Sequence, residues 1–229
     1  TLEVLARRHF NCYRQHEPGL IGIGSVPKFS IGQRALLLRT SAGNILWDCI
    51  PLIDAATVEI VRGLGGLAGI AISHPHYYST MVEWSRAFGN APIHLHSADR
   101  DWVMRPDPAI KFWDGDTLQL LPDVTLVRGG GHFPGGTMLH WAKGAGGRGV
   151  ACCADIATIA QDRKFFSFMR SYPNFIPLSA RGVQAIAASL GPFQFDAMYG
   201  HYFDRVTPTG AKKILQVSVD RYVAALNGA

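Results

Sequence analysis

Two closely spaced histidine pairs are the first feature of this chain that could do chemistry. His74 and His76 are separated by one residue and follow the apolar run 67–73, which predicts a buried strand. Two imidazoles this close to a strand end can bind one metal ion, because histidine nitrogen is a common ligand of zinc and iron. His94 and His96 have the same spacing inside a predicted strand, where alternation would place both on one face. We interpret this second pair as structural.

Three further strand ends carry single residues of the same ligand types. His132 lies in the segment 129–136, where glycines permit a tight bend that would present an imidazole at a strand end. Asp155 ends the apolar segment that begins at residue 149, and His201 follows another short apolar run. Each residue alone is weak evidence. Together with the first histidine pair they predict a metal site built from strand ends.

The segments that would position these residues alternate between strands and helices in both halves of the chain. We expect strands over residues 34–40, 45–49, 67–73, 93–96, 117–121, 125–127, 138–141, 149–153 and 195–199. We expect helices over residues 2–15, 55–64, 79–88, 179–190 and 209–226. No linker divides the chain, so we expect an N-terminal helix or extension over residues 1–18 and one domain over residues 19–229.

In this arrangement the chain resembles the metallo-β-lactamase-fold superfamily of metallohydrolases over about residues 20–205. The HxHxDH motif of that superfamily corresponds to residues 74–79, which read HPHYYS, and its GHTPG turn corresponds to residues 131–135, which read GHFPG. Its metal-bridging aspartate matches Asp155 and its last histidine matches His201. The hairpin that ends in Trp47 and Asp48 is similar to its opening strand. The resemblance implies an αββα sandwich, an α+β fold with two mixed β-sheets face to face and helices on both outer faces.

The resemblance also implies a ligand set, and this chain departs from it. The first metal position of the family matches residues that all persist here, namely His74, His76, His132 and Asp155. The second position has lost two ligands, because Tyr78 and Ser79 stand where the motif has aspartate and histidine. Neither a serine nor a neutral tyrosine readily replaces those ligands. We therefore expect one metal ion per chain, zinc in the first place and iron as the alternative.

The implied function is a metal-dependent hydrolase of a small-molecule ester, thioester, lactone or amide that uses a single metal-bound hydroxide. The candidate catalytic residues are Asp155, Tyr78 and His201. Asp155 would bind the metal or orient the attacking water, and Tyr78 would donate a hydrogen bond to an oxyanion. His201 would act as a general acid or base. Tyr78 could instead only fill the vacated second site. The alternatives are a mononuclear non-haem iron oxygenase of sulfur compounds and a metal-binding pseudoenzyme. Phosphodiester cleavage is disfavoured, because such nucleases use two metals.

The remaining composition restricts partners and location. The 229 residues are 48% hydrophobic and 17% charged, which is a globular composition, and the net charge of +5 is scattered along the chain. We expect a small-molecule substrate, no nucleic acid and no membrane. The first residues lack the pattern of a secretory signal, so we expect a cytoplasmic protein. The aromatic run 163–175 indicates core packing, a homodimer contact or a substrate pocket. The candidate pocket residues are Arg170 and Tyr172 from this run and Phe29 from the glycine- and proline-rich stretch 19–33.

Overall fold

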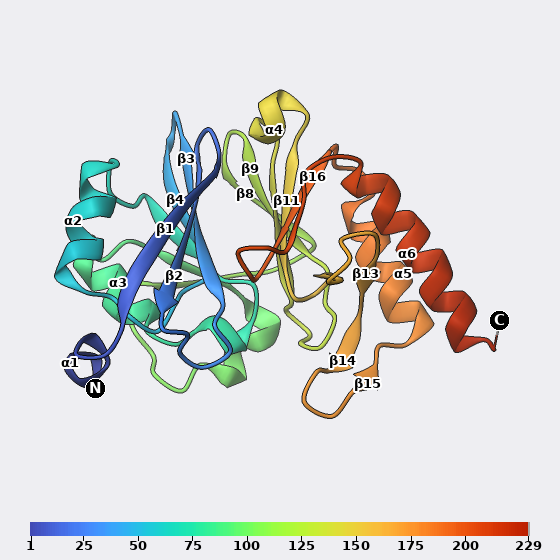
Figure 1. Ribbon diagram of the computed structural model, residues 1–229, viewed down its shortest axis with the longest axis horizontal. Coiled ribbons are helices and arrows are strands. Elements are labelled where there is room, and N and C mark those ends of the chain that lie inside the picture. Colours follow the sequence, from blue (N-terminus) through green and yellow to red (C-terminus); the bar gives the residue numbers. More distant parts are fainter. Residues whose placement is uncertain (229) are drawn as a thin grey trace. The chain divides into compact units, whose positions relative to one another are not determined.

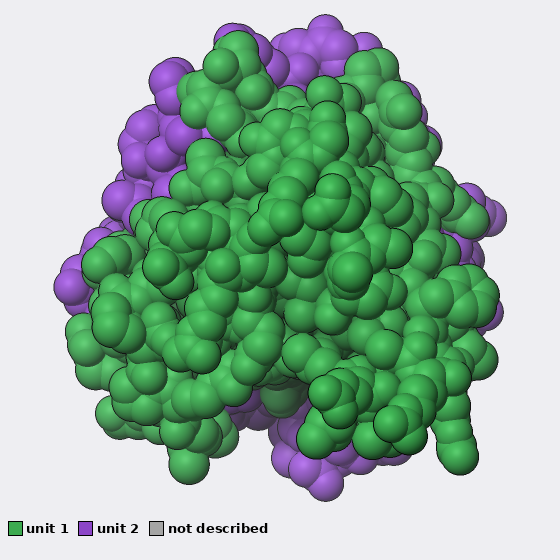
Figure 2. Space-filling model, turned by 90° about the vertical axis from the view of Figure 1, so that its left-hand side faces the viewer, with its two compact units in different colours: residues 1–95, 100–113 green, residues 96–99, 114–229 purple. Residues whose placement is uncertain are grey.

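The computed structural model describes residues 1–228, which form two compact units. Unit 1 comprises Thr1–Leu95 and Arg100–Trp113, and unit 2 comprises His96–Asp99 and the residues from Asp114 onward. Figure 2 colours unit 1 green and unit 2 purple. Each unit is built on one large mixed sheet.

Unit 1 contains a seven-stranded sheet with the strand order β1-β2-β3-β4-β5-β6-β7. The first four strands pair antiparallel, and β5 joins β4 and β6 in parallel. The strands are β1 (Phe10–Glu17), β2 (Leu20–Val26), β3 (Arg34–Thr40), β4 (Gly43–Trp47), β5 (Gly69–Ala71), β6 (Ile93–His96) and β7 (Ile110–Trp113). The helices are α1 (Leu2–Ala6), α2 (Ala55–Gly63), the short 3-10 turns η1 (Pro75–Tyr77) and η2 (Ser97–Trp102), and α3 (Met81–Ala87). The central strands β3 and β4 are almost wholly buried, as expected of apolar strands inside a covered sheet.

Unit 2 contains a six-stranded sheet with the order β17-β16-β11-β10-β9-β8, in which β11 and β16 are parallel and the other neighbours antiparallel. Its strands are β8 (Thr117–Leu121), β9 (Val124–Arg128), β10 (Thr137–Trp141), β11 (Val150–Ala154), β16 (Ala197–Gly200) and β17 (Val206–Thr207). Two small hairpins follow β11, formed by β12 (Thr158–Ile159) with β13 (Phe166–Ser167) and by β14 (Met169–Ser171) with β15 (Ile176–Pro177). The helices are α4 (Gly144–Gly147), α5 (Ala180–Leu190) and α6 (Ala211–Leu226).

Helices α5 and α6 lie side by side and supply the core of unit 2 (Figure 1). Val183, Ile186 and Leu190 are the buried residues of α5, at spacings of three and four that form one apolar stripe. Leu215 and Val219 do the same for α6. These side chains pack against residues of β9, β10, β11 and β16, so the helices support the strands whose ends carry the candidate ligands.

The structure differs from the sequence-based expectation at the N-terminus. We expected a helix over residues 2–15, and this is wrong beyond Ala6: α1 ends there, and Phe10–Glu17 is the edge strand β1. The residues of β1 pair with β2 from Phe10 opposite Val26 onward. The apolar residues of this segment have only a weak helical spacing, and pairing with the apolar strand β2 outweighs it. Tertiary contacts often override a marginal helix propensity in this way. The other expected helices and strands are present, with ends shifted by a few residues.

No helix in residues 1–228 combines the length and the apolar character that crossing a membrane would require.

Candidate metal centre

His74 and His76 are positioned in unit 1 by the end of β5 and by Asp48, which follows β4. The backbone N–H of Asp48 donates to the carbonyl of Ala71 at 2.9 Å, and Asp48 Oδ1 accepts from the N–H of Ser73 at 2.8 Å. The chain then turns into η1, where the N–H of Tyr77 donates to the His74 carbonyl at 3.1 Å. The two imidazole rings lie edge to face with centroids 5.1 Å apart.

The surroundings of both rings suit metal binding. Ser73 Oγ lies 2.9 Å from His74 Nδ1, which holds one ring nitrogen in a hydrogen bond and leaves Nε2 as the candidate ligand atom. His76 is more exposed to solvent, yet partial desolvation lowers its pKa. A lowered pKa favours the neutral ring, which is the form that binds a metal.

His132 lies in unit 2 on a tight turn between β9 and β10. The N–H groups of Gly129 and Gly130 both donate to the Gly136 carbonyl, at 2.8 and 2.9 Å. A Cβ on Gly136 would lie 2.0 Å from the Gly130 carbonyl oxygen, so the turn closes only with glycine there. The buried Asp99 accepts from the N–H of Gly135 at 2.7 Å, and burial raises the pKa of this carboxyl group while that hydrogen bond lowers it.

Asp155 directly follows β11 and faces His132. Its Oδ1 lies 3.8 Å from His132 Nε2, and both side chains are buried. The backbone carbonyl of Asp155 accepts from the hydroxyl of Tyr172 at 2.6 Å and from Thr158 Oγ1 at 3.2 Å. Burial raises the pKa of Tyr172 well above its usual range, so this hydroxyl remains a proton donor at ordinary pH.

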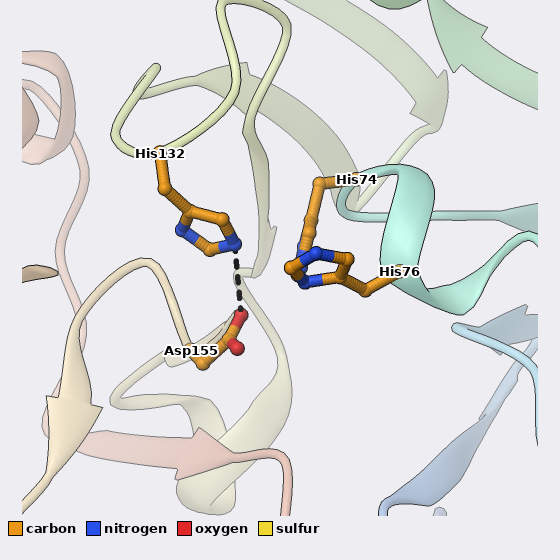
Figure 3. Close-up of side chains that lie close together, drawn as sticks. All are labelled: His74, His76, His132 and Asp155. Carbon is orange, nitrogen blue, oxygen red and sulfur yellow. Dashed lines mark ion pairs between the residues drawn. The ribbon is translucent and has the colours of Figure 1, made fainter. Parts of the chain in front are cut away.

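Four of the expected residues form one cluster of possible ligands (Figure 3). His74, His76, His132 and Asp155 each offer one ligand atom, and these atoms all lie within 4.8 Å of one another. Three imidazole nitrogens and one carboxylate oxygen form a set of ligand atoms that suits zinc or ferrous iron. Calcium and magnesium prefer oxygen ligands. The residue types and their spacing therefore fit one metal ion.

The two other expected catalytic residues lie outside this group of four. His201 is buried after β16, and its Nδ1 lies 3.1 Å from the Ala154 carbonyl. A carbonyl only accepts, so Nδ1 carries a proton and donates this hydrogen bond. Tyr78 is buried at the end of η1, and its backbone N–H donates to the Pro75 carbonyl at 3.2 Å.

The expected pocket residues occupy two different places. Phe29 lies in unit 1, where its ring meets His9 edge to face at 5.5 Å, and it lines a cavity of about 510 Å³ with residues of α1. Arg170 and Tyr172 lie in unit 2 on and just after β14. Arg170 Nη1 donates to the backbone carbonyl of His132 at 2.7 Å, and the Tyr172 ring meets the His132 ring edge to face at 5.9 Å.

Asp48 and Asp99 are residues of the candidate site whose roles sequence reasoning missed. Asp48 ends an apolar strand in the same way as Asp155, so the pattern itself was visible. Asp99 carries no such signal, because its partner Gly135 lies 36 residues away along the chain. Both carboxylates accept from the backbone N–H of a residue close to a candidate ligand, and neither is a candidate ligand itself.

Comparison with known proteins gives one sequence relative and many structural neighbours. No protein-family profile matches the chain. The chain is 47% identical over 217 residues to the Bacillus subtilis protein YmaE, which is described as uncharacterized, and the match covers 95% of this chain and 78% of the relative. The metallo-β-lactamase DIM-1 superposes with a TM-score of 0.69 at 11% identity, covering 94% of this chain and 97% of the other. A Cronobacter sakazakii metallo-β-lactamase described by its HARLDQ motif superposes with a TM-score of 0.57 at 19% identity, covering 96% and 93%. The expected fold is confirmed by these neighbours.

Proposed function

Because this chain belongs to the same family as Bacillus subtilis YmaE and has the metallo-β-lactamase fold, we propose that it is a metal-dependent hydrolase. The observation that carries the proposal is the cluster of His74, His76, His132 and Asp155. A fold alone does not establish an activity. A set of four possible ligand atoms within 4.8 Å of one another is what metal-assisted hydrolysis needs.

We propose that the cluster holds one metal ion, with the three histidines as ligands and Asp155 as the fourth ligand or as the group that orients water. When bound, zinc would supply a Lewis acid and lower the pKa of a coordinated water to about 7. A second ion is disfavoured, since Tyr78 and Ser79 stand where the HxHxDH motif has ligands. The HARLDQ motif described for the Cronobacter sakazakii metallo-β-lactamase supports the idea that this motif varies within the fold.

Two residues of the chain would handle charge and protons in this reaction. The hydroxyl of Tyr78 would donate a hydrogen bond to the oxyanion that forms when a carbonyl carbon is attacked. His201 would accept or deliver a proton through Nε2, because Nδ1 is committed to the Ala154 carbonyl. A small ester, thioester, lactone or amide is the substrate class, because each has a carbonyl carbon that an activated water can attack.

Ferrous iron is the second candidate metal, and it would change the reaction class. The cluster contains three histidines and one carboxylate. Iron oxygenases bind ferrous iron with two histidines and one carboxylate and leave coordination positions open for other ligands. Sulfur compounds are then the proposed substrates.

Metal content per chain decides between these possibilities. We would purify the protein without chelator and without added metal, and measure metals by plasma mass spectrometry. About one zinc per chain, lost in His132→Ala and retained in His94→Gln, is the expected result. His94 is a suitable control because it is a partly buried histidine outside the cluster. One iron per chain would favour the oxygenase.

The same experiment can contradict the proposal in two ways. Two metal ions per chain would refute the single-metal site. No metal after reconstitution with zinc or iron would refute metal-dependent catalysis and favour a protein without this activity.

Where zinc is bound, hydrolysis of ester, thioester and lactone panels should fall in Tyr78→Phe if its hydroxyl contacts the oxyanion.

A further inference from the structure

The segment 163–178 of unit 2 is anchored in the core and reaches the two candidate ligands of the same unit. Phe166 and Phe168 are buried among the core side chains of unit 2. The N–H of Phe166 donates to Ser218 Oγ at 2.8 Å, and the hydroxyl of Tyr222 accepts from the N–H of Leu178 at 3.0 Å. Both hydroxyl groups belong to α6, so this helix holds the segment in place.

Arg170 and Tyr172 each form a hydrogen bond from this anchored segment to the backbone of a candidate ligand. Arg170 lies on β14, and Tyr172 follows the end of that strand. Arg170 donates to the carbonyl of His132 at 2.7 Å, and Tyr172 donates to the carbonyl of Asp155 at 2.6 Å. Two neighbouring side chains therefore contact the backbones of two different candidate ligands.

The Asp155 carbonyl has two candidate hydroxyl donors, and the distances favour Tyr172. Tyr172 Oη and Thr158 Oγ1 contact each other, and both contact the Asp155 carbonyl. Each hydroxyl has one proton. Because Tyr172 Oη lies 2.6 Å from the Asp155 carbonyl oxygen and Thr158 Oγ1 lies 3.2 Å from it, we assign the stronger hydrogen bond to Tyr172. The Tyr172 ring also packs edge-on against the His132 imidazole at 5.9 Å.

We propose that Arg170 and Tyr172 are positioning residues that fix the backbones of His132 and Asp155 in the arrangement the metal requires. This inference rests on the metal site of the proposed function. It gives the two side chains a role beside the expected one of lining a substrate pocket. Groups that orient metal ligands from outside typically change metal affinity by 10-fold to 100-fold when they are removed.

Zinc affinity measured by competition with a chromogenic chelator tests this directly. Tyr172→Phe removes one hydroxyl and keeps the ring, and Arg170→Gln removes the charged guanidinium. We expect each variant to bind zinc about 10-fold more weakly, and Arg170→Lys to recover part of the loss because an ammonium can still donate to the His132 carbonyl.

The matched controls are Tyr13→Phe and Arg148→Gln. The Tyr13 hydroxyl donates to Thr57 Oγ1 at 2.8 Å, and Arg148 donates to Asp196 at 2.8 Å, but neither partner is a candidate ligand or part of the segment 163–178. We expect zinc affinity within 2-fold of wild type for both. Equal losses in Tyr13→Phe and Tyr172→Phe would overturn the inference, because the effect would then not depend on the contact with Asp155.

Hydrogen exchange on the metal-free protein provides a second readout that needs no metal. Amides of residues 129–136 should exchange faster in Arg170→Gln, and amides of residues 153–158 faster in Tyr172→Phe, while amides of unit 1 strands stay unchanged. Unchanged exchange at both places together with unchanged zinc affinity would overturn the positioning role. If the wild type binds no zinc, the proposed function fails, and exchange at these residues still decides whether Arg170 and Tyr172 hold the two backbones.

Discussion

Asp48 is not a candidate ligand, but its side chain holds the backbone next to the candidate ligand His74. Its carboxylate is buried and accepts from the N–H of Ser73, whose hydroxyl contacts His74 Nδ1. Asp48 itself has a positive φ of 61°, a conformation that aspartate tolerates better than most residues. The carboxylate thus connects the end of β4 to the start of the loop that carries His74 and His76.

Replacing Asp48 by alanine should therefore destabilise unit 1 and weaken metal binding. The substitution leaves the buried N–H of Ser73 without its carboxylate acceptor, which costs about 1–3 kcal/mol. Asp48→Asn keeps an amide oxygen at the same place and should lose less. Urea unfolding of metal-free protein measures the first effect, and chelator competition with zinc measures the second. Equal stability of wild type and Asp48→Ala would contradict the role of this hydrogen bond.

At the scale of elements, the turn 129–136 depends on glycine for close backbone contact. The Gly136 carbonyl accepts two N–H groups from the start of the turn, and its Cα lies against the Gly130 carbonyl. Arg128 Nε donates to the Pro134 carbonyl at 3.0 Å, and Asp99 accepts from Gly135. The turn is therefore specified by hydrogen bonds from outside it as well as by its own sequence.

Gly136→Ala should open this turn and release zinc. The added Cβ would meet a backbone oxygen at 2.0 Å, a contact that no side-chain movement relieves. We expect at least a 10-fold loss of zinc affinity, of the size seen when supporting groups are removed, and a lower melting temperature. Gly63→Ala is the control: its Cβ would meet nothing within 4 Å, and alanine favours the helix α2 by about 1 kcal/mol. Wild-type zinc affinity in Gly136→Ala would show that the turn tolerates the change.

The elements also show what the sequence could predict. Helix α5 and strand β3 follow from local periodicity and apolar runs. The four residues of the candidate ligand cluster follow from strand ends and the family resemblance. Strand β1 could not be predicted, because only its pairing with β2 distinguishes it from a helix. The contacts of Arg170 and Asp99 could not be predicted either, since each joins residues 36 to 38 positions apart.

At the scale of the whole molecule, buried histidines set how the folded state responds to acid. Burial lowers the pKa of His16, His94 and His140. The shift is largest at His16, where burial, with the charges of Arg34 and Arg14, lowers the pKa to about 3. In the unfolded chain a histidine has a pKa near 6.5. Below that pH the unfolded chain binds protons that the folded protein does not, so stability falls as the pH is lowered.

His16→Gln should reduce this acid sensitivity. Arg34 Nη1 donates to His16 Nε2, and glutamine offers an oxygen that can accept the same hydrogen bond. Between about pH 6.5 and pH 3 the wild type should lose free energy of unfolding relative to the variant, by at most about 1.4 kcal/mol per pH unit, and by less than this because solvent screens a half-buried ring. Above pH 7 the difference between the two should stay constant. Urea titrations of both proteins from pH 7.5 to pH 4 measure this difference, and added chelator excludes any contribution from metal release. If the free energy of unfolding changed with pH in parallel for the two proteins, His16 would not be a neutral, acid-sensitive group.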